Sequence, residues 1–223
     1  MSAITLSREL GSQGTLVAEK AARLLGFRIA DKKTLDSICR EYGLPDLGRE
    51  YSALPRFWDW LDNERRERRQ TLFTMLDRCI SALARHGDVL IVGRGGFVVL
   101  AGLADVLHVR IQAPWALRRQ RLEQRAGLLE VGKAEEALRE NDRLQRAFVK
   151  SVYGVDWDAA PGFDLVIDTG RIDLDRAAHM VAEAARAMPA AGSHGLRTTA
   201  DLEVDPVLAA SVSDALNPAL SYA

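Results

Sequence analysis

Arginine is the residue type in this chain whose positions point most directly to chemistry. Arg8 lies in a glycine-containing turn, Arg94 stands between two glycines, and Arg143 and Arg146 are three residues apart on a predicted helix. The planar guanidinium group forms two parallel hydrogen bonds with phosphate oxygens and keeps its charge at physiological pH. This pattern indicates a phosphate-bearing ligand, although each arginine could instead form a salt bridge within the protein.

The segment Ser7-Arg-Glu-Leu-Gly-Ser-Gln-Gly-Thr15 is typical of a turn between a short apolar strand and a helix. Small residues in such a turn let backbone N–H groups converge, and the helix dipole adds positive potential, so the turn can bind anions. Against the motif G-x-x-x-x-G-K-[ST], Ser7 and Ser12 occupy the glycine positions and Gln13 occupies the lysine position. By spacing alone, an ordinary glycine turn before a helix is an equal interpretation.

A framework of strands and helices must bring these residues together. Short apolar runs alternate with helical patterns, which predicts an α/β fold: a mostly parallel, five-stranded sheet flanked by helices on both faces. The predicted strands are 3–6, 27–30, 89–92, 106–111 and 164–168. The predicted helices are 15–25, 33–42, 57–86, 114–126, 133–153 and 173–188. Ligands of such sheets bind at the carboxyl ends of strands, which is where the turn and Arg94 both fall.

Length and composition place the chain among globular proteins with one main core. Its 223 residues are 48% hydrophobic and 27% charged, with a formal net charge of −1, so no global charge draws it to nucleic acid or membranes. We expect residues 1–188 to form the α/β domain. Residues 189–223 should form a tail, partly flexible or packing on a partner, with a short helix at 206–216. Two cysteines without metal-ligand spacing, and no visible secretory signal, favour reduced thiols and a cytoplasmic location.

Several segments together resemble the cytidylate kinase-like family, which is related to the nucleoside monophosphate kinases. The cytidylate kinase loop G-P-S-G-x-G-K-G-T-L aligns without a gap onto Ser7–Leu16. The family branch without the classical motif opens with Ser-Arg-Glu-(aromatic or Leu)-Gly-Ser-x-Gly, as this chain does. Further family-like segments follow in the same order, at 92–96, 106–114, 141–146, 153–157 and 163–170. The resemblance covers residues 1–187 and leaves the tail unmatched.

The resemblance implies a P-loop nucleotide kinase with a helical lid, which transfers the γ-phosphoryl group of ATP, with Mg²⁺, to a nucleoside monophosphate or similar small acceptor. The family name suggests CMP as that acceptor. Residues implied at the donor phosphates are Gly11, Ser12, Gln13, Gly14, Thr15, Arg118 and Arg121, with Thr15 also at the metal. Residues implied at the transferring phosphoryl group are Arg8, Arg94, Arg143 and Arg146, and those at the acceptor are Asp31 and Arg94.

Several of these residues have a second interpretation. Thr15 could be an ordinary residue of a first helical turn, Asp31 could cap the next helix, and Arg118 and Arg121 could lie on a solvated helix face. Gln13 donates hydrogen bonds but supplies no charge, so a second function stays open: a catalytically weak or inactive nucleotide-binding regulatory module. The expected partner is a small-molecule nucleotide, with no nucleic acid polymer and no membrane, and a homodimer stays open.

Overall fold

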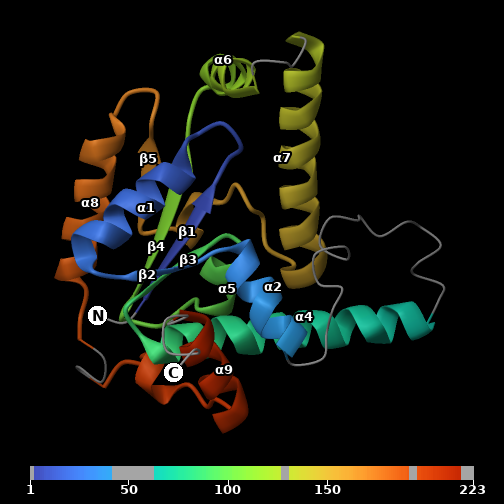
Figure 1. The fold of residues 1–223 in the computed structure, drawn as a ribbon, viewed down its shortest axis with the longest axis vertical. Helices are drawn as coiled ribbons and strands as arrows, with labels where there is room; N and C mark the ends of the chain where they lie inside the picture. The colour runs from blue at the N-terminus through green and yellow to red at the C-terminus, as the bar shows by residue number, and fades with distance from the viewer. Residues whose placement is uncertain (1–2, 42–62, 127–130, 191–194, 217–223) are drawn as a thin grey trace.

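The sheet is the framework that positions the site. The computed structural model describes residues 3–41, 63–126, 131–190 and 195–216. Within them, five parallel strands lie in the order β2-β3-β1-β4-β5 (Figure 1). The strands are β1 (Ala3–Arg8), β2 (Arg28–Ala30), β3 (Val89–Val92), β4 (Val106–Gln112) and β5 (Leu165–Asp168). The central strand β1 pairs with β3 on one side and β4 on the other. The fold class predicted from the sequence is confirmed.

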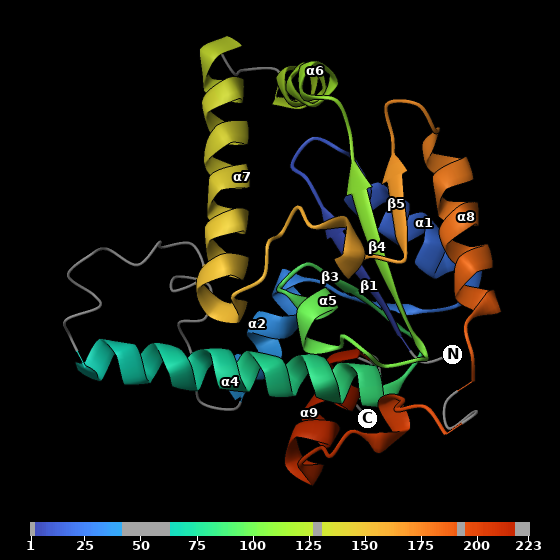
Figure 2. The same cartoon turned by 180° about the vertical axis from the view of Figure 1, so that it is seen from behind.

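Helices cover both faces of the sheet, as Figures 1 and 2 show from opposite sides. The α-helices are α1 (Gly14–Leu25), α2 (Lys32–Glu41), α4 (Asn63–His86), α5 (Gly96–Val99), α6 (Trp115–Ala126), α7 (Val131–Tyr153), α8 (Leu174–Ala187) and α9 (Pro206–Leu216). Two short 3-10 helices are η2 (Ala160–Gly162) and η3 (Thr199–Asp201). The sequence did not predict α5, because four residues are too few to show a helical period. Residues 43–56 contain proline, glycine and aspartate, from which we expect a loop, and they lie outside the described residues.

One face of the sheet is covered by α1 and α8, which pack against each other. Their buried positions are mostly alanine, including Ala18, Ala21 and Ala178, so the two helices approach closely. Val17 and Val181 are fully buried in the same layer, and burial of one such side chain contributes about 1.5–3 kcal/mol. This layer holds α1 firmly behind the predicted phosphate turn.

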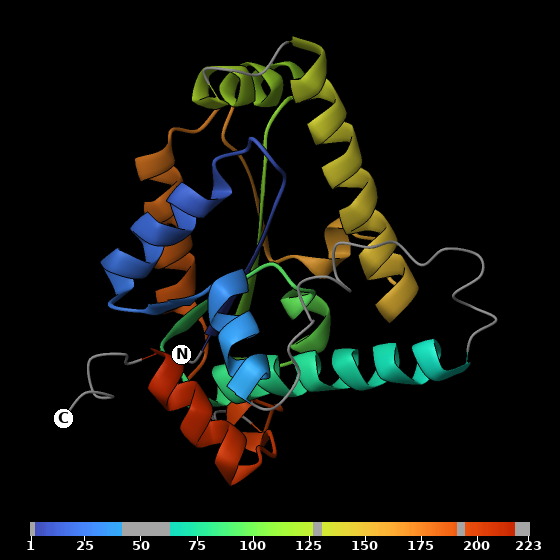
Figure 3. The same cartoon turned by 45° about the vertical axis from the view of Figure 1, so that its right-hand side comes forward.

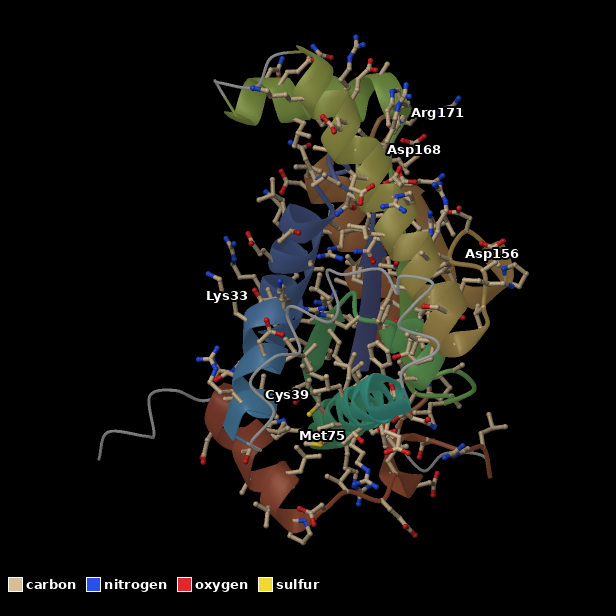
Figure 4. All side chains as sticks on the ribbon, turned by 90° about the vertical axis from the view of Figure 1, so that its right-hand side faces the viewer. Lys33, Cys39, Met75, Asp156, Asp168 and Arg171 are labelled. Atoms are coloured by element: carbon tan, nitrogen blue, oxygen red, sulfur yellow. The ribbon has the colours of Figure 1, made fainter. Side chains whose placement is uncertain are left out.

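The second face is covered by α2, α4 and α5, and α9 packs beneath them. The inward positions of α9 are Leu208, Val212 and Leu216, spaced by four residues as one helical face requires. Figure 4 shows Cys39 and Met75 between α2 and α4 in this layer. Thus α9, which the sequence placed in a tail, packs on the core of its own chain. Packing of the tail on a partner stays a prediction.

The segment before α9 is hydrogen-bonded to the residues that precede β4. Thr199 donates to the buried Asp105 carboxylate from its backbone N–H (2.8 Å) and from its hydroxyl (2.6 Å). The Arg197 carbonyl accepts from the backbone N–H of Ala104 at 2.9 Å. These contacts lie at the amino end of the sheet, opposite the candidate site.

At the carboxyl ends of the strands, α6 crosses above the sheet and α7 descends beside it (Figures 1 and 3). These two helices carry four of the predicted site arginines, Arg118, Arg121, Arg143 and Arg146. We therefore take them as the helical lid that the resemblance implies. The C-terminal end of α7 meets the long helix α4, where the rings of Phe148 and Phe73 lie edge to face with centroids 5.6 Å apart. Among the described helices, none is both long enough and apolar enough to cross a bilayer.

Candidate active site

The predicted phosphate turn is closed by hydrogen bonds between its own residues. The Ser12 backbone N–H donates to the Glu9 carbonyl at 3.2 Å, and the Ser12 hydroxyl donates to the same oxygen at 2.8 Å. The Gly14 backbone N–H donates to the Ser12 hydroxyl oxygen at 3.3 Å. Ser12 is fully buried, while Thr15 is exposed at the first turn of α1. The serine at the second glycine position therefore stabilises the turn itself.

Two residues of the turn adopt left-handed backbone conformations. Gly11 has φ of 80°, and Gln13, at the lysine position, has φ of 59° and is the N-cap of α1. The turn is also tightly packed: a Cβ atom on Gly14 would lie 2.5 Å from the Cβ of Arg8. A Cβ atom on Gly11 would lie 2.8 Å from the backbone oxygen of Arg118. Glycine is therefore required where the turn meets β1 and α6.

A second strained turn follows β3 and carries Arg94. Gly93, Arg94 and Gly95 have φ values of 77°, 58° and 75°, and a left-handed arginine is uncommon outside functional sites. The guanidinium group of Arg8 lies over Gly93, where a Cβ atom would be 2.7 Å from its Nη1. The ring of Tyr153 lies over Gly95, where a Cβ atom would be 2.4 Å away. The structure thus brings Arg8 beside the Arg94 turn.

Arg94 is only 4% exposed and points toward α2. Its Nη2 lies 3.4 Å from Oδ1 of Asp36. Asp31 directly precedes α2 and caps its first turn: its Oδ1 accepts from the backbone N–H groups of Lys33 (2.9 Å) and Thr34 (3.1 Å). The capping role that the sequence left open for Asp31 is therefore present. Its contact with an acceptor stays a prediction.

Tyr153 connects the Arg94 turn to α4. Its hydroxyl donates to Oδ1 of Asp77 at 2.8 Å. Burial raises the pKa of Asp77 above its ordinary value, and the hydrogen bond from Tyr153 offsets part of that rise. The last residue of α7 thus contacts both the glycine beside Arg94 and a partly buried carboxyl group.

Arg118 is buried between the phosphate turn and α7. Its two terminal nitrogens donate to the carboxylate of Asp142 at 3.1 and 2.6 Å, and Nη1 lies 3.5 Å from Glu9. Arg118 and Asp142 are 2% and 6% exposed. Burial raises the pKa of Asp142 above its ordinary value, although the Arg118 charge opposes that rise. In this conformation Arg118 joins α6 to α7; its contact with ATP stays a prediction.

A second ion-pair group adjoins the first through Glu9. Arg110 on β4 lies 3.5 Å from Glu9 and 2.8 Å from Asp158. Asp158 also accepts from Nε of Arg146 on α7 at 2.5 Å, and this hydrogen bond raises the pKa of Arg146. Three carboxylates and three arginines, Arg118 among them, therefore share the space beside the turn.

The two remaining predicted arginines lie in different surroundings. Arg121 donates to the hydroxyl (3.0 Å) and carbonyl (2.8 Å) of Thr169 and lies 3.4 Å from the Gly11 carbonyl, so it ties α6 to the turn. Burial lowers the pKa of Arg121. Arg143 pairs with Glu140 at 2.7 and 2.8 Å on the exposed side of α7. Asp168, the last residue of β5, and Arg171, three residues later, lie at the same end of the molecule as α6 (Figure 4).

Comparison with known proteins decides the family. The model of the family described as "Cytidylate kinase-like family" matches residues 3–171. This chain belongs to the cytidylate kinase-like family. The resemblance inferred from the sequence is confirmed, and residues after 171 lie beyond the family match.

Two cytidylate kinases are similar to this chain in sequence. A cytidylate kinase of Methanopyrus kandleri is 30% identical over 181 residues, covering 77% of this chain and 86% of the relative. A cytidylate kinase of Methanocaldococcus jannaschii is 24% identical over 159 residues, covering 70% and 86%. An uncharacterized protein of Eubacterium ventriosum ATCC 27560 has a similar solved structure, with a TM-score of 0.67 at 19% identity, covering 84% of this chain and 99% of the other. That last likeness supports the fold alone.

The family's usual ligands, ATP and Mg²⁺, fit the residues at the turn. The turn lies at the N-terminus of a 12-residue helix, whose dipole favours phosphate. Among the described residues, His, Cys, Asp and Glu form no cluster of three that could hold a metal. In kinase sites Mg²⁺ takes most of its ligands from phosphates and water, with one or two from the protein. The exposed Thr15 hydroxyl suits such a site.

The sequence did not single out five residues that the structure places beside the turn. They are Glu9, Arg110, Asp142, Trp157 and Asp158. Arg110 carried one usable signal, because a charge inside an apolar strand requires a buried partner. Asp142 and Trp157 lie in the family-like segments 141–146 and 153–157, but the sequence predicted no role for either. Asp158 carried no signal, since its partner Arg110 is distant in sequence.

Proposed function

We propose that this chain is a nucleotide kinase that transfers the γ-phosphoryl group of ATP to a nucleoside monophosphate, with CMP as the first acceptor to test. One observation carries the proposal. In a member of this family, the glycine turn at the start of α1 stands beside Arg8 and Arg94, two arginines from neighbouring strand ends. A helix N-terminus next to fixed guanidinium groups is suited to phosphates on both sides of a transfer.

The roles of the residues follow from what phosphoryl transfer needs, which is positioning and neutralisation of charge. Within Gly11–Thr15, the backbone N–H groups of Gly11, Gln13 and Thr15 bind the donor phosphates, because those of Ser12 and Gly14 donate within the turn itself. Arg94 binds the acceptor phosphate, and Asp31 lies on the acceptor side. Mg²⁺, held by the phosphates and Thr15, would neutralise charge on the β- and γ-phosphates. Arg8 approaches the transferring group from the turn.

The lid arginines complete this arrangement when the lid closes. Arg118 and Arg121 cover the donor phosphates, and Arg143 and Arg146 clamp the transferring group. In the structure Arg118 and Arg146 are paired with Asp142 and Asp158. The phosphates therefore compete with carboxylates for these guanidinium groups, and lid closure must exchange one set of partners for the other.

A second function, nucleotide binding without turnover, is favoured by two specific observations. Gln13 supplies no charge where the motif has lysine. In addition, Arg94, Arg118 and Arg146 each face a carboxylate. A protein of this kind would bind ATP as a regulatory signal and keep the fold of the family.

A phosphotransfer assay separates the two functions. Release of ADP is measured with ATP, Mg²⁺ and a panel of nucleoside monophosphates, and ATP binding is measured by calorimetry on the same preparation. Kinase function predicts turnover that is fastest with one pyrimidine monophosphate and is lost in Arg94→Ala. Tight ATP binding without turnover of any acceptor would support the regulatory function. If Gln13→Lys then produced turnover, the absence of the motif lysine would explain why the wild type has none.

Location and assembly are proposed on fewer grounds. Cys39 and Cys79 are both free and buried, which suits the reducing cytoplasm where nucleotide kinases act. Size-exclusion chromatography with light scattering would test the homodimer that the sequence left open.

A further inference from the structure

Trp157 makes a contact that reaches the first residue of the phosphate turn. This residue follows α7 and is 2% exposed. Its indole Nε1–H donates to the Ser7 hydroxyl oxygen at 2.9 Å. Ser7 stands at the position where the motif has glycine, so this chain has a hydrogen-bond acceptor at a place where the motif has no side chain. Ser7 itself is 6% exposed, so water does not easily replace the contact.

Arg110 holds the same tryptophan from its face. Its guanidinium carbon lies 4.3 Å from the ring centroid, and Nη1 donates to the Trp157 carbonyl at 2.6 Å. Arg110 is opposite Ser7 in the β1–β4 pairing, so the two contacts to Trp157 come from neighbouring strand positions. A buried guanidinium group stacked on indole is a rigid arrangement.

The same segment reaches the other side of the turn and the lid helix. Asp158, the next residue, accepts from both Arg110 (2.8 Å) and Arg146 of α7 (2.5 Å). Arg110 also lies 3.5 Å from Glu9, whose carboxylate accepts from the backbone N–H of Ala113 at 3.2 Å. Residues 157 and 158 are thus connected to Ser7, to Glu9 and to α7.

We propose that Trp157 is a positioning residue for the phosphate turn, acting through Ser7 and through Arg110. It sets where the turn lies relative to α7, and therefore where the donor phosphates sit relative to the lid. The proposal rests on the proposed function, since the donor phosphates are those of ATP. Trp157 touches no reacting atom. Its effect appears in ATP binding, because it fixes the position of the turn that binds the ATP phosphates.

The test uses Trp157→Phe and Ser7→Ala. Trp157→Phe keeps an aromatic ring under Arg110 but removes the N–H donor and part of the indole volume, whereas Ser7→Ala removes only the hydroxyl acceptor and leaves the indole in place. Loss of a buried hydrogen bond of this kind should raise KM for ATP about fivefold to tenfold in each variant. KM for the monophosphate and kcat should change about twofold at most. The double variant should be no worse than either single one, because both remove the same bond.

The matched control is Thr199→Val. This change removes a buried hydrogen bond to Asp105, at 2.6 Å, at the opposite end of the sheet. It should lower Tm as the test variants do but leave KM for ATP unchanged. A second readout needs no nucleotide: hydrogen exchange of the Ser12 and Gly14 amides, which close the turn, should be faster in Trp157→Phe and Ser7→Ala and unchanged in the control.

The outcomes separate this proposal from the proposed function. If the wild type turns over nucleotide but KM for ATP and the exchange of the turn are the same in all variants, Trp157 is a structural residue only and this proposal is wrong. If the wild type binds ATP without turnover, the dissociation constant for ATP replaces KM and the same fold-changes are expected. If the wild type neither binds nor turns over ATP, the proposed function fails, and this proposal fails with it.

Discussion

Removal of the Asp142 carboxylate should destabilise the protein strongly, because it leaves the charge of Arg118 buried. The pair has two hydrogen bonds, at 3.1 and 2.6 Å, and both residues are at most 6% exposed. Loss of one partner of such a pair typically costs about 3–5 kcal/mol. Glu9 remains 3.5 Å from Arg118 and compensates part of the charge, so the low end, about 3 kcal/mol, is expected for Asp142→Ala. For a chain of this size, that corresponds to a fall in Tm of about 6–12 °C.

The matched control is Glu140→Ala on the same helix. Glu140 and Arg143 form a pair with equally short contacts, at 2.7 and 2.8 Å, but both are exposed. Solvent already screens that pair, so Tm should not change measurably. Thermal unfolding followed by circular dichroism gives Tm, and urea unfolding at 25 °C gives the free energy of unfolding.

A third variant tests the cause of the effect. In Arg118→Met/Asp142→Leu neither charge is buried, and apolar side chains of similar volume fill the space, so most of the lost stability should return. The reasoning is refuted if Asp142→Ala unfolds at the same temperature as Glu140→Ala. It is also refuted if the double variant is less stable than Asp142→Ala, because the cost would then come from lost packing and not from an unpaired charge.

Three further predictions concern single positions. Gly95→Ala should lower Tm by several degrees, because its Cβ would lie 2.4 Å from the Tyr153 ring at φ of 75°, whereas Gly102→Ala has φ of 79° and open space and should cost less; equal losses in thermal unfolding would contradict this. Burial raises the pKa of Asp77, so the folded protein keeps this proton up to a higher pH than the unfolded chain does. The contribution of Asp77 to the free energy of unfolding therefore falls as pH rises through the folded pKa. Asp77→Asn, which keeps an acceptor for Tyr153, should therefore raise Tm at pH 7 and lose that advantage near pH 4; a gain independent of pH would mean another cause. Gln13→Gly relieves a left-handed backbone at φ of 59° and should leave stability unchanged or raise it by up to about 1 kcal/mol in urea unfolding, so a clear loss would show that the glutamine side chain stabilises the turn.

The positions of the strands and helices followed from the sequence closely. The strand predicted at 89–92 matches β3, and the helix predicted at 206–216 matches α9. The helix predicted at 173–188 begins with Asp173 as its N-cap, whose side chain accepts from the Arg176 N–H at 2.9 Å. β1 runs two residues further than predicted, to Arg8, because its end pairs with β4, and a partner strand carries no signal in the local sequence. These predictions succeeded for one reason: the spacing of apolar residues, helix capping and glycine turns are all set by residues a few positions apart in the sequence.

The sequence by itself determined the family, the fold class and the place of the glycine turn before α1, since each depends on local patterns taken in order. It also predicted Arg8 and Arg94 as site residues, because both stand at glycine turns after strands. Only the tertiary structure decided what the arginines contact. The Arg110 and Asp158 pair spans 48 residues, and the Trp157 and Ser7 bond spans 150. Such contacts depend on which strands are neighbours and where α7 lies, and side chains from distant segments meet only once the core has packed.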